Sequence, residues 1–360
     1  MARLSRAEAQ RRNRARVLAA ARDEFTERGF RDAKIDNIAE RAELTRGAVY
    51  SNFPGKRALY FAVLAEEVEM TPVESHAQPG GTPAEALGAF ARAWVARLPL
   101  ATEDERSAAR LGRDLVPEIS ADERTRLPFA QLLRLNAILL GLALERLPAR
   151  RRAADRRRVR VAETVLSTLY GASQLADAAP GFVEPFTVVR ACEQLADLDL
   201  DDEWAPAHLP YVPPARPTDE RWAPPPVTDA VRGESVPLDG DAVVAVLGLH
   251  RLAAVEEAVR AAPAGAEVTA VLVTGAPDEL APLARLVVAE FRACLRPAFP
   301  PSAWPRLRVV HDESGAVAAS AGVPVVSDAT ETAIRVRAGR IVARADGYGA
   351  CHAAATAAGR

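Results

Sequence analysis

The sequence is short of cysteine and of long apolar runs. Its three cysteines, Cys192, Cys294 and Cys351, stand far apart in 360 residues. They cannot form the framework of a disulfide-rich secreted protein, and they indicate a reducing cytoplasm. No apolar stretch approaches the roughly eighteen residues that a membrane span requires, and the chain opens with arginines rather than with the apolar core of a signal peptide. We therefore expect a cytoplasmic protein with no membrane partner.

Lysine is almost absent as well: Lys34 and Lys56 are the only two, and arginine supplies the other basic side chains. The net charge of −2 conceals an asymmetry, because residues 1–60 carry fourteen basic and eight acidic side chains, a net charge of +6. A basic head on a neutral-to-acidic body suits contact with nucleic-acid phosphates. Solvated arginine-rich helices share this composition, so charge alone does not decide.

The composition and the hydrophobic periodicity of the chain change twice along its length, which is consistent with two or three domains. Residues 10 to about 200 are rich in Ala, Leu, Arg and Glu and predict helices with short breaks. Residues 204–237 hold nine prolines with no helical or strand period, which predicts an extended linker that packs on neither side.

After the linker, short apolar runs alternate with amphipathic segments. The runs have the length and apolarity of strands buried on both faces, and the last two flank a turn at Ala338-Gly339. We predict the order β-α-β-α-β-α-β-β-α, with strands at Ala242–Leu249, Val268–Thr274, Leu307–His311, Thr332–Arg337 and Arg340–Ala345. This order is an α/β sandwich that needs nothing from the first 200 residues.

The first sixty residues contain a helix-turn-helix pattern. Apolar residues recur at helical spacing in a first helix that ends at Gly29 and in a second that covers residues 35–42. Glu43-Leu44 turns the chain, and the Thr45 hydroxyl can cap a third helix at residues 46–53. The second helix of such a pair fits the major groove of DNA and reads base edges with residues near its N-terminus.

The outward face of that third helix supplies candidate DNA contacts. Arg46 can pair with guanine O6 and N7, and Gly47 lets the backbone approach closely. Tyr50 and Lys56 are placed for phosphate contacts, which set register without specifying sequence. The predicted DNA-binding residues are Lys34, Thr45, Arg46, Gly47, Tyr50, Ser51 and Lys56. A three-helix bundle with solvated arginines has the same periodicity, but the motif order and the basic excess together favour DNA binding.

Residues 10–65 resemble the N-terminal domain of the TetR family of bacterial regulators. The resemblance rests on Asp36–Ala42 and Leu44–Leu59, above all on the Tyr-x-x-Phe-Pro-x-Lys run. Glu43 replaces the family's usual turn glycine, so we expect the turn to adopt a conformation open to a side chain. Ala33-Lys34 replaces a usual pair of threonines, and Lys34 can supply the phosphate contact that they would have made.

The resemblance also implies a helical, dimeric body at residues 65–203. Its last two helices, Arg158–Ala178 and Pro185–Leu198, would form a four-helix interface between two copies, and we expect Val165 and Leu169 to hold it. Such a dimer would present two recognition helices to a palindromic operator.

An effector pocket in this body is a further expectation, with a small, largely apolar molecule as its ligand, because few charges interrupt residues 129–144. Ordinary helical core is the competing and better supported interpretation of the same side chains. The candidate lining residues are Phe90, Trp94, Phe129 and Leu133.

The C-terminal domain resembles a thioredoxin-like domain of the peroxiredoxin kind, on residues 311–323 and 334–344. Chemistry in that fold needs a cysteine at the start of the helix after the first strand. Residues 249–254 offer none, and the proline expected before the hairpin is missing from residues 329–332. Cys351-His352 is too poor for a metal site. We therefore predict a redox-inactive domain with neither cofactor nor metal.

The fold prediction is multidomain: an all-α helix-turn-helix domain (1–64), a helical effector-binding and dimerisation domain (65–203), a proline-rich linker (204–237) and an α/β thioredoxin-like domain (238–360). The predicted function is a TetR-type repressor, not an enzyme, which a small-molecule effector releases from its operator. The alternatives are a redox sensor or thiol-dependent reductase or peroxidase fused to a helix-turn-helix, and a C-terminal protein-interaction module. The sequence names neither effector nor operator and does not exclude activation.

Overall fold

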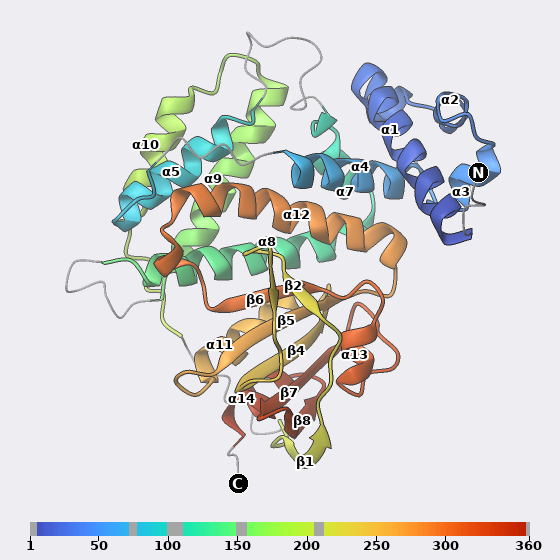
Figure 1. The fold of residues 1–360 in the computed structure, drawn as a ribbon. Coiled ribbons are helices and arrows are strands. Elements are labelled where there is room, and N and C mark those ends of the chain that lie inside the picture. Colours follow the sequence, from blue (N-terminus) through green and yellow to red (C-terminus); the bar gives the residue numbers. More distant parts are fainter. Residues whose placement is uncertain (1–5, 72–77, 99–110, 149–156, 205–211, 358–360) are drawn as a thin grey trace.

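Helices and a twisted sheet occupy opposite ends of the molecule (Figure 1). Two long helices in contact with each other, α12 (Pro277–Ala298) and α8 (Glu123–Glu145), lie between the remaining helices of the first 200 residues and the sheet of the C-terminal part. The computed structural model describes residues 6–71, 78–98, 111–148, 157–204 and 212–357.

The described residues of the N-terminal domain form four helices: α1 (Arg6–Asp32), α2 (Ile35–Arg41), α3 (Arg46–Tyr50) and α4 (Lys56–Met70). α1 is interrupted at Gly29, where the first helix was predicted to end. Gly29 has φ 71°, a backbone conformation that favours glycine. The short helices α2 and α3 are joined by a tight turn, so the predicted helix-turn-helix is confirmed.

The helical body follows, and its described residues include α5 (Pro83–Val95), α7 (Leu115–Ser120), α8 (Glu123–Glu145), α9 (Val159–Ala178) and α10 (Pro185–Leu195). α8 is long and apolar enough to cross a membrane by length and composition, but 67% of its apolar window is buried inside the protein. Burial between neighbouring helices accounts for that apolarity, as in the core helix of a globular domain.

The C-terminal unit is built on a six-stranded sheet in the order β1-β8-β7-β4-β5-β6. Three parallel strands form one half, and three antiparallel strands form the other. The parallel strands are β4 (Ala242–Gly248), β5 (Glu267–Val273) and β6 (Leu307–His311); the others are β7 (Glu331–Arg337), β8 (Arg340–Asp346) and β1 (Arg216–Arg221). The helices between and after them are α11 (Val255–Ala261), α12, α13 (Ala316–Ser320) and α14 (Ala350–Thr356).

This arrangement confirms the predicted β-α-β-α-β-α-β-β-α order, with strand bounds that differ from the predicted ones by one residue at most. The β7–β8 hairpin turns at the predicted pair, since Ala338 and Gly339 both have positive φ (46° and 70°). Two consecutive residues of this kind form the turn that suits the twist of a tight hairpin. The α/β class of this unit is therefore shown.

The expectation of a linker at 204–237 is wrong for its second half. Residues 216–236 contain β1 and the hairpin of β2 (Val227–Asp229) and β3 (Glu234–Val236). Trp222 is buried, and its indole N–H donates to the carbonyl of Leu238 at 2.7 Å. Proline did not exclude strands here because β1 is an edge strand, where a missing backbone donor is tolerated.

α12 joins the sheet to the helical body through one continuous apolar core. The Phe291 ring lies 5.8 Å from the Phe90 ring of α5, measured between centroids. The Asn136 amide of α8 donates to the carbonyl of Val287 at 3.3 Å, and both groups are buried. The expectation that the α/β unit needs nothing from the first 200 residues is therefore wrong, because periodicity identifies an apolar face but not the element that covers it.

Candidate nucleic-acid interface

The predicted cap and core of the recognition helix are present in α3. The Thr45 hydroxyl accepts a hydrogen bond from the backbone N–H of Ala48 at 3.2 Å, which satisfies one of the free donors at the helix start. Val49 and Phe53 are buried, whereas Tyr50 is 42% exposed. α3 thus has one face fixed in the core and one face available to a partner.

Arg46 stands at the first position of α3 with a largely exposed side chain. Its guanidinium lies 3.3 Å from the Asp36 carboxylate of α2 and 5.6 Å from the centre of the Tyr50 ring. A hydrogen bond to Tyr50 and then the charge of Asp36 raise the pKa of Arg46. Arg46 therefore stays charged and is held at the helix start, where a bidentate donor can face a guanine edge.

Gly47, Ser51 and Lys34 complete the outward surface. A side chain at Gly47 would meet only the Thr45 hydroxyl, 3.9 Å away, so the backbone is open to close approach. The Ser51 hydroxyl donates to the carbonyl of Ala48 at 2.9 Å and is turned back onto its own helix. Lys34, the N-cap residue of α2, is exposed, which leaves its ammonium free to reach a phosphate.

Lys56 does not fit the phosphate contact that the sequence suggested. Its ammonium donates to the carbonyls of Phe30, Arg31 and Ala33 at 2.7, 3.1 and 3.0 Å, and it lies 4.5 Å from the centre of the Phe30 ring. All three N–H donors of the ammonium are thus used inside the domain. Lys56 fixes the α1–α2 corner to the start of α4.

The turn before α3 departs from the prediction in its backbone. Glu43 has φ 50°, so the turn keeps the left-handed conformation that glycine would adopt. The Glu43 N–H donates to the carbonyl of Glu40, and its carboxylate pairs with Arg16 of α1 at 2.7 Å. The turn does accept a side chain, as expected, but in a backbone conformation that favours glycine and therefore at a cost in strain.

Sequence reasoning missed two residues that hold this interface together. Glu24 of α1 is fully buried, and its carboxylate accepts from the Asn37 amide at 2.8 Å and lies 3.3 Å from the Arg41 guanidinium. Arg14 of α1 donates to the carbonyl of Asn52 at 3.2 Å, just beyond α3. The sequence does show charged residues at these positions of the first helix, but it does not show which groups they contact.

The candidate lining residues of an effector pocket in the helical body pack against other side chains of the described residues. Phe90 is packed against Phe291 of α12, and the Trp94 and Phe129 rings each pack edge-on against Tyr170 of α9. Two cavities lined mainly by residues of the C-terminal unit have none of Phe90, Trp94, Phe129 and Leu133 in their walls. These side chains therefore belong to the ordinary helical core, which was the competing interpretation.

The residues expected to form the dimer interface are buried within a single copy of the protein. Val165 and Leu169 of α9 are fully buried, since α9 packs against α5, α8 and α10 of the same copy. They were assigned to an interface because the TetR resemblance implies one at these two helices, and an apolar helical stripe does not show whether its partner is a second copy or the same chain. The large apolar side chains left exposed nearby include Leu175, Phe182 and Phe186.

Comparison with known proteins gives matches to the N-terminal part of the chain. Residues 17–63 match the family model described as bacterial regulatory proteins, tetR family. Over 77 residues, 20% of this chain, the sequence is 44% identical to the HTH-type transcriptional regulator SrpR of Pseudomonas putida. The same length and identity hold for the uncharacterized HTH-type transcriptional regulator TtgW of the same species.

The chain spans 36% of the length of SrpR and 57% of that of TtgW. Over 56 residues it is 39% identical to the HTH-type transcriptional activator FasR of Mycolicibacterium smegmatis, 26% of that protein's length. Among solved structures, a TetR transcriptional regulator from Rhodococcus sp. RHA1 aligns with 53% of this chain and 95% of its own length, at a TM-score of 0.33 and 18% identity. By the match of residues 17–63, the helix-turn-helix at the N-terminus is of the tetR family.

Proposed function

We propose that this protein is a TetR-type transcriptional regulator that works in the cytoplasm and binds operator DNA through α3. The observation that carries the proposal is the exposed face of α3, with Arg46 and Tyr50 outward and Val49 and Phe53 in the core. It lies within the segment that matches the tetR family model. Arg46 would read a base, while Lys34 and Tyr50 would contact phosphates.

The regulator would bind its operator as a homodimer. The apolar side chains of Leu175, Phe182 and Phe186, exposed by 45%, 72% and 80%, lie on α9, on α10 and between them. Burying them against a second copy would remove the largest exposed apolar side chains of this region from water. Two recognition helices related by a two-fold axis would then require a palindromic operator.

The C-terminal unit would act as a regulatory module of thioredoxin-like type rather than as a thiol enzyme. Cys192, Cys294 and Cys351 are all buried. Burial raises the pKa of Cys294 to about 11 and that of Cys192 to about 12. A nucleophilic cysteine needs the opposite shift. A small-molecule effector would release the regulator, a repressor in this proposal, from DNA.

An operator selected from random duplex DNA tests the proposal. We expect Arg46→Ala to weaken operator binding by about 1–3 kcal/mol and to relax specificity at one base position. Arg340→Ala is the matched control, because Arg340 is exposed at the start of β8, away from α3 and α10. Equal operator affinity of the Arg46→Ala protein and wild type in a gel-shift titration would rule out docking through α3.

A further inference from the structure

A cavity of about 580 Å³ lies where α12, the β2 strand and the end of β6 meet. It is called the α12 cavity below. Much of its wall is apolar, with Val227 of β2, Val288 and Ala289 of α12, and Val310 and Val317 on the far side. Its size is that of a site for a small organic molecule.

Two arginines of α12 line this cavity. Arg285 and Arg292 are seven residues apart, so they stand two turns apart on one face of the helix, with Val288 and Ala289 between them. The Nε atom of Arg292 is buried without a hydrogen-bond partner, and its Nη1 reaches only the carbonyl of Ala230, at 3.5 Å. No carboxylate of the described residues lies within ion-pair distance of Arg292.

The other charged groups around the α12 cavity leave Arg292 without a counter-charge. The Asp312 carboxylate is occupied, because it accepts from the Ala318 N–H at 2.8 Å and from the Ser314 hydroxyl. Glu313 pairs with Arg285 at 3.2 Å. Glu69, the last acid of the lining, is exposed near the end of α4. Arg292 is thus partly buried in the cavity wall without a partner carboxylate among the described residues, an arrangement that a bound anion would stabilise.

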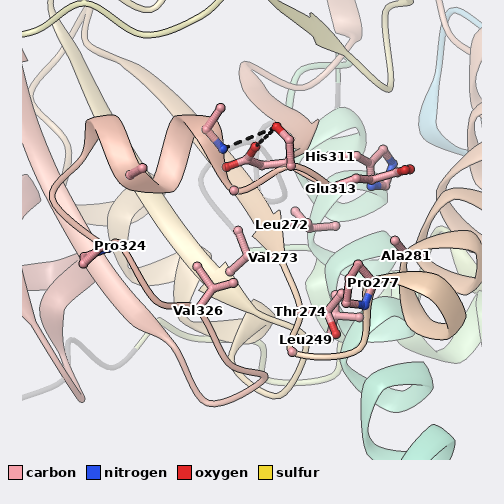
Figure 2. Close-up of a pocket in the computed structure, with 17 residues that line it drawn as sticks. Leu249, Leu272, Val273, Thr274, Pro277, Ala281, His311, Glu313, Pro324 and Val326 are labelled. Carbon is pink, nitrogen blue, oxygen red and sulfur yellow. Dashed lines mark hydrogen bonds between the residues drawn. The ribbon is translucent and has the colours of Figure 1, made fainter. Parts of the chain in front are cut away.

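His311 adds a neutral polar group to the wall. Burial, and then the positive charges of Arg285 and Arg292, lower the pKa of His311 to about 4. The same histidine lines a second cavity of about 440 Å³ at the carboxyl ends of β4, β5 and β6. Figure 2 shows this second cavity, with His311 and Glu313 at one side of it and Pro324 at the other. That second cavity contains no arginine, so the α12 cavity is the one suited to an anion.

We propose that the α12 cavity binds a small organic carboxylate with an apolar body, and that it is the effector site of the regulator proposed above, on which this inference rests. The guanidinium of Arg292 receives the carboxylate, for which its planar fork is matched. The apolar walls receive the body of the ligand. The largely apolar effector expected from the sequence is thus retained, with one negative charge and in a different part of the molecule.

The position of the cavity connects it to the recognition helix. Arg285 of the cavity wall lowers the pKa of Arg14 by like charge, after burial of Arg14, which is the larger cause. Arg14 in turn holds the carbonyl of Asn52 and lies 4.3 Å from the centre of the Phe53 ring, at the end of α3. An anion beside Arg285 and Arg292 would change the field at Arg14 and the packing of α12 on α4.

The test measures melting and operator affinity of the full-length protein with hexanoate, octanoate and benzoate, each against its neutral alcohol. We expect at least one carboxylate to raise the Tm by mass action and to change operator affinity, while its alcohol has a much weaker effect. Arg292→Gln should raise the Kd of that carboxylate about tenfold or more, because a charge-assisted contact is lost. Arg296→Gln, one turn along the same helix and outside the cavity, is the matched control.

A second variant keeps the test valid if Arg292→Gln does not fold. Thr228 is exposed on β2 at the cavity wall, so Thr228→Trp should block the cavity without changing any charge. No shift with any of the three carboxylates, or equal shifts in wild type, Arg292→Gln and Thr228→Trp, would overturn the site. Carboxylate binding with unchanged operator affinity would overturn its role as effector site. Absence of operator binding without any ligand, by contrast, would contradict the proposed function itself.

Discussion

Arg57, the second residue of α4, forms an ion pair with Glu279 in the first turn of α12, more than two hundred positions later in the sequence. The same guanidinium lies 2.6 Å from Asp122 before α8. Arg57 directly follows Lys56, which holds the α1–α2 corner. The DNA-binding domain, the helical body and the C-terminal unit therefore meet at one side chain.

This junction predicts a measurable coupling between Arg57 and Glu279. All three charged side chains are 24–29% exposed, so solvent screens them only in part. We expect a double-mutant cycle with Arg57→Ala and Glu279→Ala, followed by urea unfolding, to give a coupling energy of about 1 kcal/mol. The Arg340–Asp219 pair, whose side chains are 47% and 77% exposed, is the control and should couple more weakly. Equal coupling in the two pairs would mean that the junction contributes no more than a surface ion pair.

The packing of α12 predicts that Phe291 supports the whole molecule. Phe291 is 1% exposed and fills the space beside Phe90, so Phe291→Ala should lower the free energy of unfolding by about 3–5 kcal/mol. Phe182→Ala, at a phenylalanine that is 72% exposed, should cost far less in the monomer. Chemical denaturation measures both.

The packing of α12 on the helical body also predicts how the C-terminal unit behaves alone. We expect isolated residues 238–360 to expose the apolar face of α12 and to aggregate. A cooperative melt of that fragment would show that the face is dispensable.

The strained turn predicts a substitution that stabilises the protein. Glu43 occupies the left-handed region, which a side chain adopts at a cost, so Glu43→Gly should raise the free energy of unfolding by about 1 kcal/mol. The lost Arg16 pair offsets little, because the Glu43 side chain is 85% exposed. Glu40→Gly, inside α2, should lower the same quantity by a similar amount. A loss of stability in both variants would mean that the Arg16 pair matters more than the backbone.

Substitutions of the two lysines should have different effects on the salt dependence of operator binding. Lys34→Ala should reduce the slope of log affinity against log salt by about one, since one phosphate contact is lost. Lys56→Ala should instead lower the melting temperature, because the carbonyls of Phe30, Arg31 and Ala33 lose their donor. A reduced slope with unchanged melting in Lys56→Ala would restore the phosphate role that the sequence suggested.

The sequence predicted local features correctly, but it did not predict which elements pack against each apolar face. The cap at Thr45, the inward Val49 and the turn at Ala338-Gly339 follow from residue type and period, and all three are present. Val165 was assigned to a dimer interface through the family resemblance, and Phe90 was a candidate pocket residue although ordinary core was the better supported interpretation. A stripe of this kind looks the same whether its cover is a ligand, a second copy or another helix of the chain. Only the fold shows that α12 and the neighbouring helices cover them.

The histidine in the wall of the α12 cavity predicts a pH dependence of stability. The pKa of His311 falls from 6.5 to about 4, so between these values the unfolded chain binds a proton that the folded chain does not. The free energy of unfolding should therefore fall as pH drops from 6.5 toward 4 and gain nothing from this residue above 6.5. In His311→Asn this part of the slope should vanish, while His250→Asn, outside both cavities, should keep it. Urea unfolding at pH 7, 6 and 5 measures the slope, and equal slopes in all three proteins would show that His311 protonates without opposing the fold.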